Sequence, residues 1–209
     1  MEFSPYVLEA AGQVRSSLFG GLEGTWTSTG GTTEATFPRY AVSLAPFQRG
    51  TFEVCLIRAR RNESFDSVTS IFGKMDVTML FAMAAYTVDL SVPGGRLKLA
   101  GKTQNLVDRV SRNPTEFRAH IGNQLQVETG KYYALASLLV NYAATGDYPI
   151  LGTAAISGLL PASVDSDFPI MYGWTWADNI RDFPDTVDMS SLGRSTRAPW
   201  LAFSNMPKG

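Results

Sequence analysis

The sequence predicts an all-β protein, an antiparallel two-sheet sandwich of jelly-roll type with a short N-terminal helix or arm. Its composition includes 19 glycines and 11 prolines, and only 18% of its residues are charged. This composition favours many short strands joined by tight turns over helices faced with charged side chains. Apolar and polar residues also alternate with a period of two in successive segments, and turn residues separate these segments.

The segment from Tyr132 to Val140 is apolar on both of its alternating faces, which is typical of a strand in the middle of a sheet. The preceding segment, Gln124 to Val127, alternates polar and apolar residues. Between them, the Glu-Thr-Gly-Lys sequence at 128–131 has the composition of a tight turn. We therefore expect the two segments to form a β-hairpin at the centre of the domain.

Residues 1–24 are expected to form the N-terminal helix or arm, and residues 25–209 a single β-sandwich domain. Apolar residues recur at helical spacing between Pro5 and Phe19. An amphipathic helix ahead of a β-domain can pack on its own sheet or dock on a neighbouring subunit. The sequence leaves both uses open.

Alternating patterns predict the first strands at Tyr40 to Leu44 and Phe52 to Ile57. The segment from Lys74 to Leu90 fits both a helical and a strand period. β-Branched residues near its ends and the turn Pro93-Gly94-Gly95 directly after it favour a strand, which returns as Arg96 to Gly101.

Later strands are expected from Phe117 to Gly122, from Tyr148 to Ile156 and from Ala198 to Phe203. Gly152 inside the second of these indicates a bulge or a close approach of another part of the chain. About eight strands are expected in total, a number that suits a jelly roll.

The charge balance argues against nucleic acid and anionic membranes as partners, because 18 basic and 19 acidic residues give a formal net charge of −1. No run approaches the roughly 18 apolar residues of a membrane span, and the N-terminus lacks a secretion-signal pattern. We therefore expect a soluble protein without membrane insertion. Cys55 is the single cysteine and is expected to be a buried apolar residue.

The residues that could carry chemistry form no catalytic pattern. A Ser-His-Asp triad would have to use His120, the only histidine, and one Cys with one His cannot supply the usual zinc ligands. An irregular excursion at 164–195 holds six aspartates: Asp165, Asp167, Asp178, Asp182, Asp185 and Asp188. They could pair for glycoside hydrolysis, but their spacing matches no calcium loop and turn capping is favoured. We expect no enzymatic activity, cofactor or metal site.

Within the same excursion, Tyr172, Trp174 and Trp176 occupy alternate positions and would project from one face of an extended segment. The row could fill a core or a subunit interface, which is favoured because large aromatic side chains rarely stay exposed. It could also stack on sugar rings, with Asp178 and Asn179 bonding the hydroxyl groups. We take these five residues as the candidate ligand or interface residues.

Several short motifs follow one another along residues 37–203. In order, they are a strand ending in Tyr86, a Pro-Gly turn with its return strand at 92–101, a strand at 116–119, a segment at 125–135 with Leu, Val, Gly and two Tyr at fixed spacing, Leu151-Gly152, Leu-Pro-Ala-Ser at 160–163 and Ala-Pro-Trp-Leu at 198–201. This order resembles the β-sandwich modules of virion proteins of tailed bacteriophages, in tail fibres, minor tail proteins and capsid-attached fibres.

The resemblance implies a structural virion protein, a tail or capsid appendage or decoration, assembled in the host cytoplasm and bound to other virion proteins. It also implies an outward display, with host attachment through surface glycans as one use, and a homo-oligomer in which a trimer is favoured. Two alternatives stay open: a free carbohydrate-binding module, and an enzyme such as a glycan depolymerase.

Overall fold

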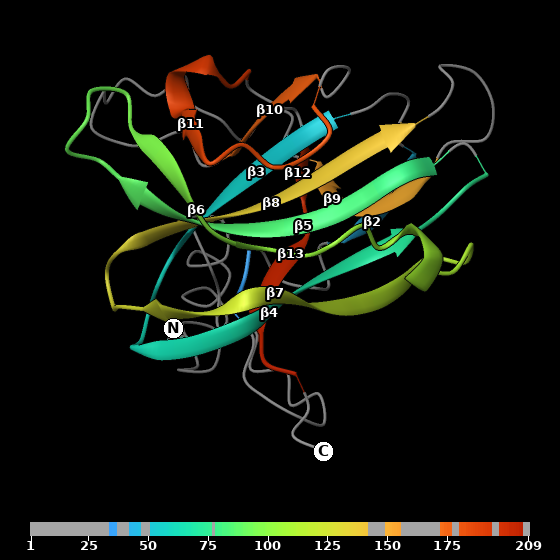
Figure 1. The fold of residues 1–209 in the computed structure, drawn as a ribbon, viewed down its shortest axis with the longest axis horizontal. Helices are drawn as coiled ribbons and strands as arrows, with labels where there is room; N and C mark the ends of the chain where they lie inside the picture. Colours follow the sequence, from blue (N-terminus) through green and yellow to red (C-terminus); the bar gives the residue numbers. More distant parts are fainter. Residues whose placement is uncertain are drawn as a thin grey trace, which may run out of the picture.

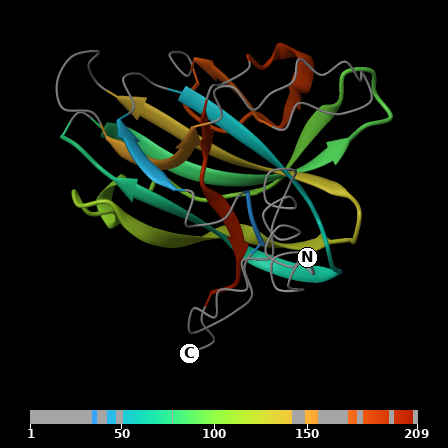
Figure 2. The same cartoon turned by 180° about the vertical axis from the view of Figure 1, so that it is seen from behind.

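The computed structural model describes residues 34–36, 42–46, 51–76, 78–141, 149–155, 172–176, 180–193 and 197–206. Within them the chain forms two antiparallel sheets that pack against each other (Figures 1 and 2), which confirms the predicted fold class. The expected helix at 5–19 lies outside the described residues. In the described part of the chain, no helix is long and apolar enough to cross a membrane.

The first sheet contains β3 (Thr51–Arg58), β5 (Thr78–Asp89), β6 (Arg96–Lys102), β8 (Tyr132–Asn141), β10 (Tyr172–Trp176) and β11 (Thr186–Asp188). Among the described residues it is six-stranded, with the order β10-β3-β8-β5-β6-β11. We call it the six-stranded sheet. β8 has a neighbour on each side, as expected for a strand that is apolar on both faces.

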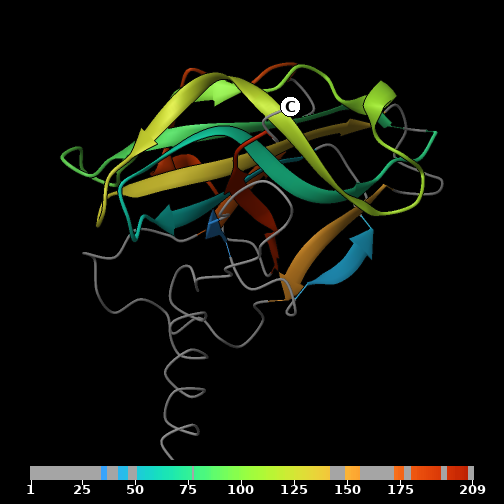
Figure 3. The ribbon, with the colours of Figure 1, turned by 90° about the horizontal axis from the view of Figure 1, so that it is seen from below.

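The second sheet contains β1 (Glu34–Ala35), β2 (Ser43–Pro46), β4 (Glu63–Gly73), β7 (Thr115–Val127), β9 (Ile150–Ala155), β12 (Arg197–Pro199) and β13 (Leu201–Ser204). Its strand β4 lies between β7 on one side and β13 and β9 on the other. Figure 3 shows β2 and β9 side by side at one end of this sheet.

The strands from β2 to β9 follow jelly-roll topology. They form two four-stranded sets, β2-β9-β4-β7 and β3-β8-β5-β6. Of the consecutive pairs, only β5 and β6 belong to the same set, and every other connection between successive strands crosses from one sheet to the other. This arrangement of two interleaved sheets is the jelly roll that the sequence predicted.

The same topology shows that the expected hairpin at 124–140 is wrong. β7 pairs with β4 in one sheet, and β8 pairs with β3 and β5 in the other. The turn at 128–131 therefore carries the chain between sheets, although its composition suits a hairpin equally well. β7 is also longer than expected, since it continues through Gly122 to Val127.

The ambiguous segment at 74–90 forms β5, which confirms the preference for a strand. β5 and β6 form a hairpin in which Asp89 lies opposite Arg96. Gly94 and Gly95 in the connecting turn have φ angles of 81° and 77°, a left-handed conformation that glycine adopts without strain. The Pro-Gly turn was therefore correctly identified from the sequence.

The longest strand that was not expected is β4, and another strand was expected to be continuous. β4 escaped notice because serine and threonine interrupt its apolar pattern, yet Ser67, Thr69 and Ser70 are all buried in it. The predicted last strand, Ala198 to Phe203, is divided into β12 and β13 at Trp200, whose backbone N–H donates to the Gly152 carbonyl at 2.8 Å.

The interior between the sheets is filled by large apolar side chains. Phe65, Phe72, Phe81 and Phe203 are fully buried there. The rings of Phe72 on β4 and Phe81 on β5 stack across the two sheets, with 3.8 Å between their centroids and 4° between their planes. This packing joins the sheets and leaves the centre of the sandwich occupied by the protein's own side chains.

The outer face of the six-stranded sheet is also buried. A second cluster includes Phe52 on β3, Tyr86 on β5 and Leu138 on β8, together with Phe183. Phe183 belongs to residues 180–193, which we call the strap because they cover this face. The strap contains β11 and the 3₁₀ turn Met189–Ser191.

Gly152 lies where two neighbouring side chains come close to the backbone, as the sequence suggested. A Cβ atom at this position would be 2.9 Å from Ile71 Cβ and 3.1 Å from Val42 Cγ1. Both distances are shorter than ordinary carbon contacts, so an added methyl group forces its neighbours to move.

We expect Gly152→Ala to lower the free energy of unfolding by about 1–3 kcal/mol, because the new methyl group overpacks this site. The measurement is urea unfolding followed by tryptophan fluorescence. Leu44→Ala is the control, since Leu44 lies opposite Gly152 on β2 but is 55% exposed, and its loss should cost less than about 0.5 kcal/mol. Equal effects of the two changes would contradict the close approach.

Candidate functional site

The aromatic row predicted from the sequence lies at one end of the six-stranded sheet. Tyr172, Trp174 and Trp176 belong to β10, which pairs antiparallel with β3 and is the last strand on that side among the described residues. Asp178 and Asn179 lie outside the described residues. The segment expected to be irregular therefore contributes an edge strand that places the three aromatic residues at alternate positions along one rim.

Opposite the aromatic row, β3 carries residues of unusual polarity for a core. The register pairs Tyr172 with Cys55 and Trp174 with Glu53. Glu53 is only 3% exposed, and its neighbour across the other side of β3 is Ser137 on β8, which is buried too. A buried carboxyl group thus lies directly beside the edge strand.

Cys55 lies in this buried row and is poorly suited to nucleophilic chemistry. Burial, and secondly the carboxylate of Glu53, raise the pKa of its thiol to about 12, although a hydrogen bond with the Thr36 side chain opposes the shift. The reactive form of a cysteine is the thiolate, which is scarce at such a pKa. The expectation of a buried cysteine is confirmed.

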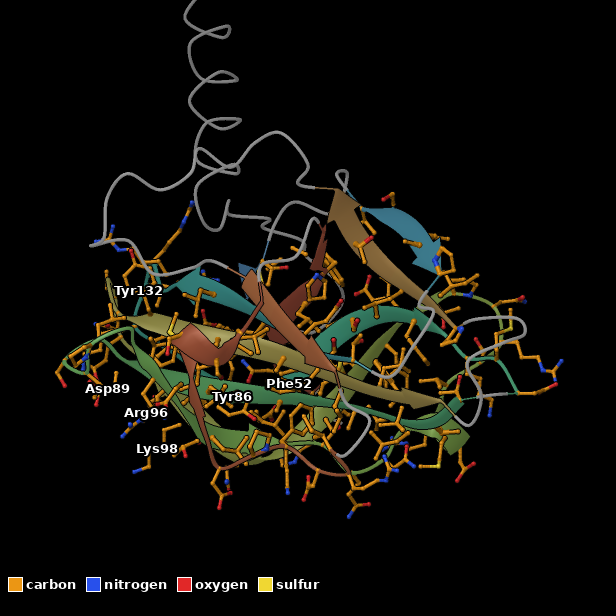
Figure 4. All side chains as sticks on the ribbon, turned by 90° about the horizontal axis from the view of Figure 1, so that it is seen from above. Phe52, Tyr86, Asp89, Arg96, Lys98 and Tyr132 are labelled. Carbon is orange, nitrogen blue, oxygen red and sulfur yellow. The ribbon has the colours of Figure 1, made fainter. Side chains whose placement is uncertain are left out.

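The strap is held on the outer face by aromatic packing. The Phe183 ring contacts the rings of Phe52 and Tyr86 edge to face, with centroid distances of 6.0 and 6.5 Å. The Tyr86 hydroxyl donates a hydrogen bond to the Pro184 carbonyl at 3.0 Å, and burial raises the pKa of this hydroxyl above its ordinary value. Figure 4 shows Phe52 and Tyr86 near the middle of this face.

Polar contacts along the edge of β6 complete the attachment of the strap. Arg96 Nε donates to Asp188 Oδ1 at 2.8 Å, and Lys102 forms an ion pair with Asp182. In Figure 4, Asp89, Arg96 and Lys98 lie at the rim of the sheet, away from the central aromatic rings. The strap is therefore anchored at both ends of β6 and by its buried middle.

Two of the six aspartates considered as chemical groups serve this attachment. Asp182 Oδ1 accepts the backbone N–H of Phe183 at 2.8 Å, and the Lys102 ammonium holds the pKa of Asp182 below its ordinary value. Asp188 pairs with Arg96. Only the contact of Asp182 with the Phe183 N–H is of the capping kind that was favoured from the sequence, whereas Asp188 makes an ion pair and no side-chain cap. Asp165, Asp167 and Asp178 lie outside the described residues.

His120 lies exposed on β7, on the polar side that the sequence indicated. It lines an open pocket of about 250 Å³, together with Lys102, Thr103, Gln104, Asn105, Leu106, Arg109, Ala119 and Gly122. The pocket brings together the end of β6, the following loop, the 3₁₀ turn Val107–Arg109 and β7.

Sequence reasoning missed this pocket because its residues come from separate segments. The stretch from Thr103 to Asn113 has turn composition, and nothing in it indicates that Arg109 lies near His120. The only signal was the placing of Lys102, Arg109 and His120 within 19 positions of one another, which occurs on ordinary solvated surfaces as well.

Within the described residues, no group of three or more His, Cys, Asp or Glu side chains could hold a metal ion together. The geometric features that carry functional information are therefore the edge strand β10, the strap and the pocket beside His120.

We expect the Cys55 thiol to resist alkylation by iodoacetamide in the folded protein and to react rapidly in urea. With its pKa at about 12 in the folded state against 9.0 ordinarily, the protonated thiol stabilises the fold fully below about pH 9, and this contribution is lost as pH rises towards 12. Cys55→Ala should remove that part of the alkaline destabilisation. Rapid labelling of the native protein would contradict the buried position.

We expect Tyr86→Phe to lower the free energy of unfolding by about 1 kcal/mol, because it removes the hydrogen bond to Pro184 while keeping the ring in the outer cluster. The measurement is urea unfolding. Tyr132→Phe is the control, because Tyr132 is only half-buried at the start of β8. An equal loss from both changes would show that the strap is not held through Tyr86.

The chain is thus a jelly roll whose outer sheet face is covered by its own strap and whose rim presents an aromatic edge strand. In comparisons with known proteins, no protein-family model matches the chain and no curated protein matches its sequence significantly.

Proposed function

We propose that the chain is a structural subunit of a tailed phage or phage-like particle, a tail or capsid appendage or decoration displayed outward. The observation that carries the proposal is the jelly-roll strand order of β2 to β9, which supports the resemblance seen in the order of sequence motifs. Jelly rolls serve in viral capsid proteins, in lectin domains and in cupins, so the fold narrows the function without deciding it.

The packed interior favours a capsid protein or a lectin domain over a cupin. An enclosed active site requires space between the sheets, but Phe65, Phe72, Phe81 and Phe203 fill that space. Partners and ligands can then be met only on the outside of the sandwich. A protein that acts through its surface alone suits assembly or attachment.

The edge strand β10 is the surface that best fits a contact with another subunit. Its sequence Tyr-Gly-Trp-Thr-Trp has no charge and no proline, two of the devices by which natural proteins protect edge strands. Aromatic residues are enriched in the centres of interfaces. Pairing of β10 with β10 of a second copy would be two-fold and give a dimer, so a trimer requires β10 of each copy to contact a different surface of the next. This closed ring is the arrangement we favour, as in the phage appendages that the sequence resembles.

The same aromatic row is what favours the second candidate, a free carbohydrate-binding module. Aromatic residues at alternate positions of an extended strand form the kind of platform on which sugar rings stack. The two candidates differ in mass, since a binding module is expected to be monomeric. They also differ in whether Trp174 is needed for assembly or for sugar binding.

We expect light scattering coupled to size exclusion to give the mass of a trimer, and Thr175→Lys to give a monomer, because lysine on an edge strand opposes pairing with a second strand. Thr186→Lys is the matched control: Thr186 lies on β11 at the opposite edge of the same sheet and should leave the trimer intact. Circular dichroism should show the same fold for all three proteins.

A monomeric wild-type chain would reject assembly through β10. If that monomer bound neutral oligosaccharides and lost this binding on Trp174→Ala, the carbohydrate-binding module would replace the virion subunit as the better proposal. Mass spectrometry of particles purified from the source culture provides the direct test of the virion assignment. Absence of the chain from such particles would overturn it.

A further inference from the structure

The pocket beside His120 has the composition of a site for a small anionic molecule. Lys102 and Arg109 contribute two positive charges, and among the described residues no acidic side chain lines the pocket. Its floor includes the buried apolar side chains of Leu106 and Ala119. A cationic rim over an apolar floor suits a ligand with a charged group on one side and a carbon skeleton on the other.

The polar groups at the back of the pocket are already engaged, which makes its wall rigid. Asn105 Oδ1 accepts the N–H groups of Phe81 and Val107, while its Nδ2 donates to the Met79 carbonyl at 3.1 Å. Thr103 Oγ1 accepts the N–H of Met83 at 3.0 Å. These two side chains fix the loop after β6 against β5 and do not need a ligand themselves.

The donors at the rim are held in place by the fold. The backbone N–H of Gly122 donates to His120 Nδ1 at 3.0 Å, so the neutral ring carries its proton on Nε2 and presents that N–H as a donor. The Arg109 guanidinium lies over the Phe117 ring, 5.8 Å from its centroid. Such stacking orients the planar fork that binds a carboxylate through two hydrogen bonds.

Lys102 is shared between the pocket and the strap. Its ammonium pairs with Asp182, but an ammonium has three N–H groups and one acceptor leaves others available. Asp182 reduces the positive charge near the pocket, and Asp108 lies in the same 3₁₀ turn as Arg109. Arg109 is therefore the group on which recognition of an anion should depend most.

We propose that this pocket binds one sugar ring that carries a carboxylate, such as a uronic acid unit of an acidic glycan. Its volume of about 250 Å³ is just below the range for drug-sized ligands, which fits a single ring. Arg109 and Lys102 bind the carboxylate, and His120 and Gln104 bond the hydroxyl groups. The biological use of the site rests on the proposed display of the chain, whereas the binding itself is a property of the isolated protein.

The test is calorimetric titration of the full chain with methyl glucuronide, with methyl glucoside and with inorganic phosphate. We expect glucuronide to bind at least about tenfold more tightly than glucoside, since one charge-assisted hydrogen bond contributes roughly ten- to hundredfold in affinity. We also expect it to bind more tightly than phosphate, which lacks the ring. Equal binding of the two sugars, equal binding of phosphate, or no binding of glucuronide would each overturn the proposal.

We expect Arg109→Gln to weaken glucuronide binding about tenfold or more, and His120→Gln to weaken it by a smaller factor. Arg112→Gln is the matched control, because this arginine lies three positions further on, pairs with Asp76 on the surface and does not line the pocket. It should stay within twofold of the wild type. Equal affinity in the Arg109 and Arg112 variants, with all melting temperatures unchanged, would reject the site.

These titrations fail or succeed independently of the proposed virion function. A trimer found in purified particles that binds no glucuronide would keep the structural role and reject the pocket. A chain absent from particles that still discriminates glucuronide from glucoside through Arg109 would keep the pocket and reject the virion role.

Discussion

The structure depends on one constraint: the six-stranded sheet is apolar on both faces, so both faces must be covered. Along β8, Leu135 and Leu139 belong to the cluster between the sheets, while Ala136 and Leu138 belong to the cluster on the outer face. Antiparallel sheets commonly leave one face to water. Burying a side chain of the size of leucine contributes about 1.5–3 kcal/mol, so leaving either face of this sheet open would expose many such groups.

The two faces of the six-stranded sheet are covered by different elements. The second sheet covers the inner face through stacked aromatic rings such as those of Phe72 and Phe81, whereas the strap at 180–193 covers the outer face through Phe183. The strap pairs with the sheet only through the short strand β11, so it needs further attachments. Tyr86 and the ion pairs along β6 provide them. Asp182 and Asp188, two of the aspartates considered as chemical groups in the sequence, therefore belong to this attachment.

The features that could be predicted are those that depend on neighbouring residues. The two-faced pattern of Tyr132 to Val140 correctly placed β8 inside a sheet, and the Pro-Gly turn correctly placed β5 beside β6. The turn at 128–131 misled, since a tight turn can lead either to a hairpin or to the other sheet, and only distant pairing decides. β4 was missed because its hydroxyl groups find partners far along the chain, as Thr69 does with Ser204 at 2.8 Å. The pocket beside His120 was missed because its residues come from separate segments of the chain.

Both surfaces proposed for contacts lie outside the filled interior, and the strand order separates them. Three strands, β3, β8 and β5, lie between β10 and β6. With neighbouring strands about 4.8 Å apart, these four steps place the edge strand about 19 Å from β6, whose last residue lines the pocket. Contact along β10 itself therefore does not cover the pocket. Assembly and ligand binding are therefore compatible in a single particle, and each copy of the chain in it would carry its own site.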